Sequence, residues 1–371
     1  MSFFRRIFRA LFKPKSTDAE DQETAGEEGA TNVVAPGVTA KPYATKQVDK
    51  ETLAWLAEQE AKLKRGDMAG FFRPAGFQII TVEEDGAEQL DVLPAGIHGH
   101  DEKVTAMWIA PNGTIFLCGY MFTGKDGPDT GVVYRKDPGE EARIVFTKAA
   151  NEIYSIWGCN DTDVYAAGKR TLIHWNGSEW SELDISGIDG NILGGWSNGQ
   201  DLWIVTGTSA GSGAIYRRAG NSWQKEITTP GVLRSIHGVG DAIWAAGGDG
   251  VILRRVGEVW KEERGGLSGT AEGLLVISEH DQFAIGFEAR GASLLHSTGN
   301  GEWWPVFLPS SRVFGVAGSG PHDVHALSID GIFKRVGSEW SKLDFDSNAC
   351  TVIAVRWGTL VCAREKRVSL G

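Results

Sequence analysis

The side chains of this chain that could hold a metal ion lie together in one short segment. His98 and His100 are separated by a single glycine, and Asp101 follows directly. On an extended segment, side chains at i and i+2 project to the same side, so the two imidazoles could share an ion. No third ligand is evident, and a histidine pair in a loop is more often simply exposed. We therefore predict no metal and no other cofactor, since no nucleotide-binding or catalytic fingerprint appears either.

A set of aspartates recurs along the chain, and carboxylates that meet at one site could serve as general acids and bases. Each of them, however, stands just ahead of an apolar run that reads as a strand. An aspartate in that place usually accepts a hydrogen bond from its own backbone in an Asx turn. We therefore expect a structural role and predict that the protein is not an enzyme. The recurring residues are Asp163, Asp201, Asp241, Asp281 and Asp323.

Three tryptophans and one histidine occupy equivalent places in four successive apolar runs. They are Trp108, Trp157, Trp196 and His237. Packing inside the protein is the more common role for such residues, because large aromatic side chains dominate burial. If they are exposed, they could stack on sugars or anchor a protein loop, since tryptophan is frequent among interface hot spots. We predict these four as the binding residues.

All of these positions belong to a repeat of about 40 residues. Its clearest copies begin at Ser155-Ile-Trp-Gly158 and Ser235-Ile-His-Gly238, and each is followed by a run that ends in Ala-Ala-Gly. Four short strand-like runs per copy predict a β-propeller blade, because so small a sheet cannot bury both of its faces alone. The middle residues of the second runs stand 49, 38, 41, 39 and 42 residues apart, at Phe116, Tyr165, Trp203, Trp244, Phe283 and His325, with a weaker seventh mark at Leu360.

The repeat resembles a bacterial propeller repeat of the form Ser-Ile-Trp-Gly, Asp-Val-Trp-Ala-x-Gly, Gly-x-Ile-x-x-Trp, Gly-x-x-Trp, and more distantly the kelch and Asp-box propellers. The resemblance extends from Phe77 to the end of the chain. It implies an architecture and no particular activity, because propellers host lectins, scaffolds, inhibitors and enzymes. The fifth copy, around Ala271 to Leu308, departs most from the pattern, with Ile277-Ser-Glu-His280 in place of Trp-Gly or His-Gly.

The predicted fold is an all-β propeller of seven blades, with six as the alternative. Strand-like runs at Phe77–Val82 and Gln89–Leu93 precede the first copy and have no innermost strand of their own, and the last copy ends soon after its second strand. We predict one composite blade built from both ends of the chain, which would leave no open sheet edge. Whether Arg367–Leu370 adds a third C-terminal strand to it stays open.

Residues 1–16 form a cationic amphipathic pattern. Phe4, Phe8 and Phe12 recur at helical spacing, with Arg5 and Arg9 between them. Such a helix can lie in an anionic membrane interface, with its aromatic face in the acyl boundary and its arginines on head groups. The alternatives are docking on a protein, including the chain's own surface, and no function at all.

Beyond this helix we predict a disordered acidic linker at 17–46, a short helix and connection at 47–75, and the propeller at 76–371. Residues 1–75 hold 12 basic and 11 acidic residues, whereas the remaining 296 hold 25 and 37. Phosphate repulsion makes so acidic a propeller a poor binder of nucleic acid. We therefore expect no nucleic acid as partner and favour another protein, in particular a basic one.

These patterns together predict a non-catalytic, protein-binding propeller tethered by a flexible N-terminal arm. We expect it to neutralise or position another protein at a bacterial envelope, for example a toxin or a component of an envelope machine. A carbohydrate-binding propeller and a hydrolase with an unrecognised site are the alternatives. No apolar run reaches about 18 residues, and the four cysteines show no zinc spacing. We therefore expect a cytoplasmic protein, with peripheral contact to the inner face of the membrane as the further expectation.

Overall fold

The computed structural model describes residues 77–365, with gaps at 84–85, 87, 94–101, 123–127, 264–266, 268, 289–290, 311, 346 and 348–349. All of the described residues belong to one compact unit. The predicted N-terminal helix, the acidic linker, the second helix and the His98–Asp101 cluster lie outside the described residues. So do the membrane-contact residues Phe4, Arg5, Phe8, Arg9 and Phe12.

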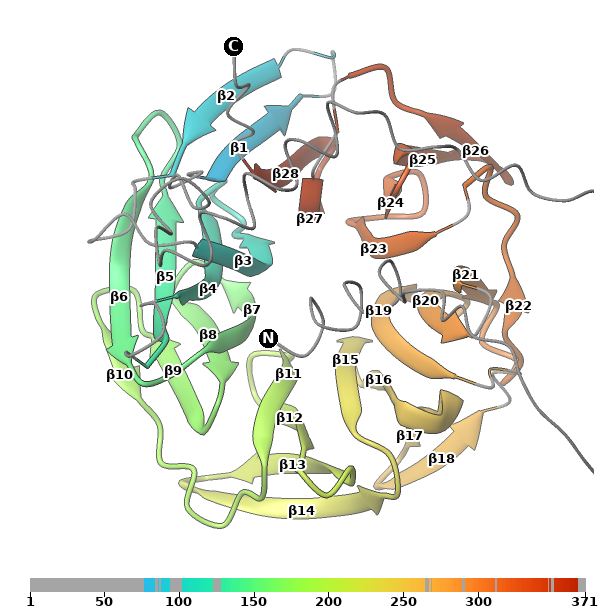
Figure 1. Cartoon of the computed structure of the whole chain (residues 1–371). Coiled ribbons are helices and arrows are strands. Elements are labelled where there is room, and N and C mark those ends of the chain that lie inside the picture. The colour runs from blue at the N-terminus through green and yellow to red at the C-terminus, as the bar shows by residue number, and fades with distance from the viewer. Residues whose placement is uncertain are drawn as a thin grey trace, which may run out of the picture. The chain divides into compact units, whose positions relative to one another are not determined.

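Seven four-stranded antiparallel sheets stand around a common axis, as Figure 1 shows. The predicted seven-bladed propeller is therefore confirmed. In blades 1 to 3 the strands, from the axis outward, are β3 (Glu102–Ile109), β4 (Ile115–Met121), β5 (Thr130–Lys136) and β6 (Arg143–Ala149); β7 (Ile153–Asn160), β8 (Asp163–Gly168), β9 (Thr171–Trp175) and β10 (Trp180–Glu182); and β11 (Asn191–Ser197), β12 (Leu202–Gly207), β13 (Gly213–Ala219) and β14 (Ser222–Thr229).

Blades 4 to 6 repeat the same up-and-down order, and one short 3-10 helix, η1 (Gly248–Gly250), lies in blade 4. The fifth copy, which departs most from the sequence pattern, forms a complete blade. The strands are β15 (Leu233–Val239), β16 (Ala242–Gly247), β17 (Ile252–Val256) and β18 (Val259–Glu263); β19 (Thr270–Ser278), β20 (Asp281–Glu288), β21 (Gly291–Ser297) and β22 (Trp304–Pro305); and β23 (Val313–Gly318), β24 (Val324–Ser328), β25 (Gly331–Val336) and β26 (Glu339–Lys342).

Blade 7 joins the two ends of the described chain. Its inner strands are β27 (Cys350–Arg356) and β28 (Thr359–Glu365), and its outer strands are β1 (Phe77–Val82) and β2 (Glu88–Val92). Strand β1 pairs with β28 from Phe77↔Glu365 to Val82↔Leu360. The composite closing blade is therefore present, and among the described residues it has two strands from each end.

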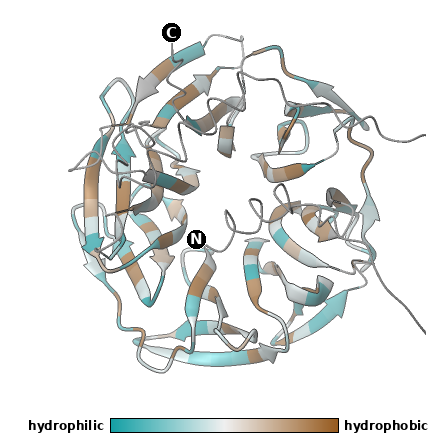
Figure 2. Cartoon of the chain, in the orientation of Figure 1, coloured by the Kyte–Doolittle hydropathy of each residue, from teal (hydrophilic) through white to brown (hydrophobic). Residues whose placement is uncertain are grey.

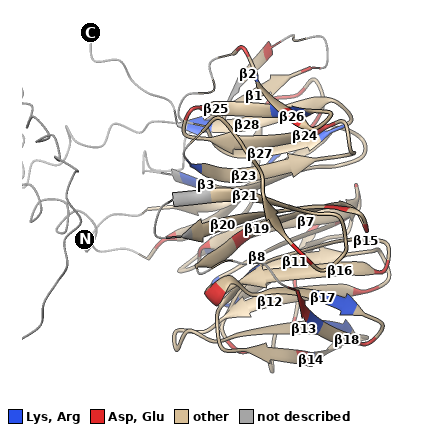
Figure 3. Cartoon of the chain, turned by 90° about the vertical axis from the view of Figure 1, so that its right-hand side faces the viewer, with Lys and Arg blue, Asp and Glu red and all other residues tan. Residues whose placement is uncertain are grey.

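The second strand of each blade forms the core. Every residue of β12 and β16 is buried, because neighbouring blades cover both faces of the sheet and leave no alternation of polar residues. Figure 2 shows hydrophilic colour on outer strands such as β14, which face solvent. In the side view of Figure 3, charged residues lie chiefly near strand ends and turns.

The innermost strand of every blade carries a β-bulge near its start. In blade 2, for example, the register shifts between Ile153 and Ser155, so that Tyr154 has no direct partner on β8. A bulge re-aims the side chains that follow it. After the shift, the middle residue of each second strand faces one fixed position of the innermost strand. The pairs are Trp108↔Phe116, Trp157↔Tyr165, Trp196↔Trp203, His237↔Trp244, Leu275↔Phe283, Ala317↔His325 and Val355↔Leu360.

Candidate functional site

Three of the recurring aspartates, Asp163, Asp201 and Asp281, make contacts across the sheet, and their partners differ from the predicted ones. The carboxylate of Asp163 lies 2.7 Å from Nε2 of His174 on the third strand. The His174 ring stacks on Tyr165 at 4.5 Å between centroids. Burial alone would raise the pKa of Asp163, but hydrogen bonds from His174, Cys159 and Tyr165 outweigh it and lower that pKa. The Asx-turn expectation is therefore wrong for this residue, because its acceptor atoms are used across the sheet.

Two other blades repeat this arrangement with different side chains. Asp201 accepts a bidentate pair of hydrogen bonds from Arg217 at 3.0 Å, and that guanidinium lies over Trp203. Asp281 binds both His296 and Arg335. The Asx turns of these loops are made instead by asparagines such as Asn160, which accepts from the backbone of Thr162. Asp163, Asp201 and Asp281 thus fix the third strand of their blades to the second.

The four residues predicted to bind a partner do come together. Trp108, Trp157, Trp196 and His237 occupy the same register position in blades 1 to 4. They line an axial cavity of about 450 Å³. The remaining three blades carry Leu275, Ala317 and Val355 at this position.

Each of the three indoles packs against a glycine of the next blade. A Cβ at Gly195 would lie 2.0 Å from Cζ2 of Trp157, and one at Gly238 would lie 3.0 Å from Cε2 of Trp196. Trp108 lies over Gly158 in the same way. These contacts explain why glycine stands beside the aromatic residue in the repeat. The visible role of the indoles is blade-to-blade packing, and their part in binding stays a prediction.

His237 makes the corresponding contact by a hydrogen bond. Its Nδ1 accepts the backbone N–H of Val276 in blade 5 at 3.1 Å. Burial lowers the pKa of His237 to about 4. The imidazole is therefore neutral near pH 7, and its Nδ1 is available as an acceptor.

A second feature of this end of the channel is the turn Trp357-Gly358 between β27 and β28. Both residues have positive φ, 49° and 84°. The Trp357 side chain is 66% exposed. Its backbone N–H donates to Oγ of Ser319 at 2.8 Å, and that of Gly358 donates to Oδ2 of Asp323 at 3.0 Å. Two hydrogen bonds to blade 6 thus hold an exposed indole in place.

The indole stands at the edge of a groove of about 370 Å³ between blades 7 and 1. Ile109, Ile115 and Val361 contribute apolar surface to this groove, and the turn at Pro138-Gly139 also lines it. We call it the 7–1 groove. The charged residues that line it are Glu83, Lys136, Asp137 and Arg356.

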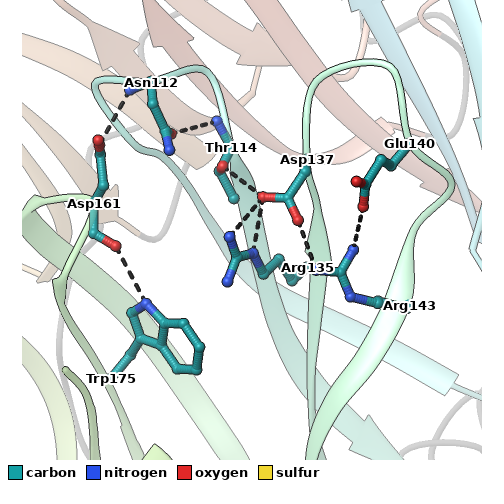
Figure 4. A network of polar contacts seen from close by, with 8 residues as sticks. All are labelled: Asn112, Thr114, Arg135, Asp137, Glu140, Arg143, Asp161 and Trp175. Atoms are coloured by element: carbon teal, nitrogen blue, oxygen red, sulfur yellow. Dashed lines mark hydrogen bonds and ion pairs between the residues drawn. The ribbon is translucent and has the colours of Figure 1, made fainter. Parts of the chain in front are cut away.

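Asp137, next to the Pro138 turn, is the centre of a network of polar contacts (Figure 4). Its carboxylate accepts hydrogen bonds from Thr114 at 2.8 Å, from Arg135 at 2.9 Å and from Arg143 at 2.6 Å. Burial would raise the pKa of Asp137, but these bonds outweigh it and lower that pKa. Asn112 extends the network to blade 2 by donating its backbone N–H to Asp161.

The face that carries the 7–1 groove is acidic at its rim. Because strands alternate in direction, the turns between first and second strands and those between third and fourth strands lie on one face, which we call the turn face. The guanidinium of Arg254 agrees with this, because it donates both to Gly299, between the third and fourth strands of blade 5, and to Glu279, between the first and second. The exposed carboxylates of these turns are Glu140, Glu141, Glu179, Asp241, Glu258, Glu279, Glu302 and Glu339.

Sequence comparisons do not place the chain in a family: no family model matches it, and no curated protein matches it either. Among solved structures, the chain is similar to the WD40 β-propeller domain of Doa1, with a TM-score of 0.55 and 13% identity over 79% of this chain and 98% of that one. The computationally designed protein Ika8 gives a TM-score of 0.47 at 11% identity, over 72% and 95%. The likeness to the Doa1 domain shows the propeller fold alone.

Within the described ranges, no group of three or more histidines, cysteines and carboxylates is arranged to hold a metal ion. No helix in the same part of the chain is long and apolar enough to cross a membrane.

Proposed function

We propose that this protein is a non-catalytic, protein-binding propeller whose partner docks on the turn face at the 7–1 groove. The observation that carries the proposal is the conformation of Trp357. In a two-residue turn with both φ values positive, Asn-Gly is the most favourable sequence, and a bulky residue at the first place is strained. Three other two-residue turns of this face have a glycine, Gly240, Gly257 or Gly337, at the position of positive φ. An exposed tryptophan kept there against local preference is typical of a binding anchor.

The negative charge at the rim of the turn face favours a basic partner. Its exposed carboxylates surround a groove with an aromatic edge, and the residues from 76 onward have 12 more acidic than basic residues. Complementary charge speeds encounter and sets orientation, whereas buried aromatic anchors supply most of the affinity. A basic protein with an apolar loop residue fits both parts of this surface.

A carbohydrate-binding propeller would present the same exposed aromatic pocket in several blades. In the described part of the chain, the exposed tryptophans are Trp304 on β22 and Trp357 in a turn, at unrelated places in their blades. We therefore propose a protein partner and not a carbohydrate.

The N-terminal arm indicates where in the cell the protein would act. The pattern of Phe4, Phe8 and Phe12 with Arg5 and Arg9 supports contact with an anionic membrane, from the cytoplasmic side. A propeller held there by a flexible linker would neutralise or position its partner at a bacterial envelope.

The test compares two exposed tryptophans. The partner is first identified by affinity capture with the full chain, and its Kd is then measured by calorimetry for the wild type, Trp357→Asn and Trp304→Asn. We expect Trp357→Asn to weaken binding about 30-fold, as for an interface anchor. Trp304, which is 64% exposed but on the outer strand of blade 5, is the matched control, and we expect its variant to bind within about 3-fold of the wild type.

Folding is checked on the same variants. Because Asn-Gly suits the turn, Trp357→Asn should melt at the same temperature as the wild type or higher. Equal losses of affinity for the two variants, or no loss for either, would show that the 7–1 groove is not the binding site.

A further inference from the structure

Arg356, the residue before Trp357, has a guanidinium without a carboxylate partner. Its Nη1 lies 3.4 Å from the carbonyl oxygen of Ile109, which is a long hydrogen bond, and its Nε is buried without a hydrogen-bond partner in the described structure. The guanidinium carbon lies 4.4 Å from the centroid of the Trp357 ring. No described carboxylate lies within ion-pair distance of it.

Other arginines at the turn face are paired. Arg217 binds Asp201, Arg335 binds Asp281 and Arg135 binds Asp137, each at 3.0 Å or less. Desolvation lowers the pKa of Arg356, and the charge of Asp161, which is not within ion-pair distance, offsets this only in part. A partly buried cation with neither a close counter-ion nor a full set of acceptors is unfavourable for the folded protein. The stability of the folded protein therefore does not explain why an arginine stands at position 356.

The position of Arg356 makes it available to a ligand. It lines both the axial cavity and the 7–1 groove, so it lies where the two meet. Trp357 beside it holds the guanidinium by a cation–π contact and leaves its polar edge to an incoming group. Arginine binds carboxylates through two parallel hydrogen bonds, which is the pairing that this side chain lacks.

We propose that Arg356 receives a side-chain carboxylate of the partner protein, an Asp or Glu whose apolar neighbour packs on Trp357. This inference rests on the proposed protein-binding function and names the chemistry of the segment that enters the groove. The acidic rim indicates basic residues on both sides of that carboxylate, toward Glu83 in the groove and Glu140 beside it. An acidic residue inside a loop can have a basic residue on each side, whereas one at a chain terminus has a neighbour on one side only.

The test selects ligands without assuming a partner. A random 12-residue library, displayed on phage so that no peptide has a free C-terminus, is selected on the full chain. Enriched peptides are then synthesised with amidated ends, together with versions in which each Glu or Asp is replaced by Gln or Asn. We expect enriched sequences to share one acidic residue beside a large apolar residue, with basic residues on either side.

The decisive measurement is a double-mutant cycle. Arg356→Met and the Glu→Gln peptide should each weaken binding by at least about 10-fold, and the two changes together should weaken it little further, because both remove the same pair. Arg254→Met is the matched control: that guanidinium also lies over a tryptophan, Trp244, at the turn face, but it pairs with Glu279. We expect the control to leave peptide affinity unchanged and Arg356→Met to leave the melting temperature unchanged or raised.

The outcomes separate this inference from the proposed function. Peptides that need Trp357 but bind equally to wild type and Arg356→Met would overturn the inference alone. Enriched peptides without an acidic residue, or independent effects of the two changes in the cycle, would also overturn it. A partner and peptides that are all indifferent to Trp357→Asn would overturn the proposed function as well, and the absence of any enriched peptide would overturn the inference.

Discussion

Asp323 of blade 6 accepts the backbone N–H of Gly358 in blade 7, with 3.0 Å between Oδ2 and N. The hydroxyl of Ser319 donates to the same oxygen and in turn accepts the N–H of Trp357. This small network ties the turn that presents Trp357 to the neighbouring blade. The orientation of the exposed indole therefore depends on a carboxylate more than 30 residues away in the sequence.

Replacing this carboxylate should loosen the turn. Asp323→Ala leaves the N–H of Gly358 without its acceptor, and we expect a loss of about 1 to 2 kcal/mol in the free energy of unfolding. Partner affinity should fall as well, since Trp357 is no longer held in place. Urea unfolding and calorimetry measure the two effects. Asp330→Ala, which removes a surface carboxylate bonded to Ser310, is the control and should change stability by less than about 0.5 kcal/mol.

The glycines under the indole ring should tolerate no side chain. A Cβ at Gly195 would lie 2.0 Å from Cζ2 of Trp157, so Gly195→Ala should cost about 1 to 3 kcal/mol through overpacking. Gly320→Ala is the control, because a Cβ there would meet no atom within 4 Å. Chemical unfolding measures both, and a second change of Trp157→Ala should cost less in the Gly195→Ala background than alone. Equal stability of the two glycine variants would contradict the packing role of Trp157.

The binding role predicted for the ring is tested on alanine variants of the same positions. Truncation of a packed tryptophan should cost roughly 3 to 5 kcal/mol of folding free energy. A variant of Trp108, Trp157, Trp196 or His237 that loses partner affinity but keeps its melting temperature would instead support a binding role at that position.

The fold could be predicted from sequence to the level of the single blade, because the apolar residues that recur in the repeat are the buried ones. The spaced residues Phe116, Tyr165 and Trp203 lie on second strands that are covered on both faces, so their apolar character recurs whatever the function. Blade number and the composite closure follow from counting such marks.

The candidate site could not be predicted in this way. The weak seventh mark of the repeat, Leu360, follows Trp357-Gly-Thr359 directly, and this tryptophan is the exposed anchor proposed above. The sign that could have revealed it is local: a two-residue hairpin turn that begins with Trp in place of Gly or Asn. The 7–1 groove joins Ile109 to Arg356, which the sequence separates by most of the propeller, so only the closed ring brings them together.

Acid should destabilise the propeller through His237. Its folded pKa of about 4 lies below the ordinary value of 6.5, so the unfolded chain binds a proton first as the pH falls. The stability that the neutral ring contributes is full above pH 6.5 and is lost between about pH 6.5 and pH 4, on the order of 3 kcal/mol. Burial lowers the pKa of His325 to about 4 as well, so the two histidines share this slope. His237→Gln should therefore remove about half of the slope, measured by urea unfolding from pH 7.5 to 4.5. His280→Gln, at an exposed turn, should leave the curve as it is. A slope in His237→Gln as steep as that of the wild type would contradict the assignment.

The N-terminal segment should bind anionic vesicles in a salt-dependent manner. Each Lys or Arg near such a surface contributes about 1 kcal/mol, and added salt screens that attraction. In co-sedimentation of the full chain with vesicles containing phosphatidylserine, the double variant Phe4→Asp, Phe8→Asp should stay in the supernatant even at low salt. Phe307→Asp removes an exposed phenylalanine of the propeller and is the control. Sedimentation that ignores both salt and the double variant would favour protein docking of this segment.

Deletion from the N-terminus should be tolerated up to the closing blade and no further. Removal of residues 1–46 takes away no blade strand, so the product should remain folded with an unchanged melting temperature. Removal through Leu93 also takes away β1 and β2, and with them the pairing of Ile80 with Cys362 at the centre of blade 7. Because β28 then becomes an open edge and Ile80 no longer fills the cluster between blades 6 and 7, cooperative unfolding should disappear and the protein should aggregate. Calorimetry and size-exclusion chromatography compare the two products, and a monomeric longer deletion with the wild-type melting curve would show that the N-terminal strands do not close the ring.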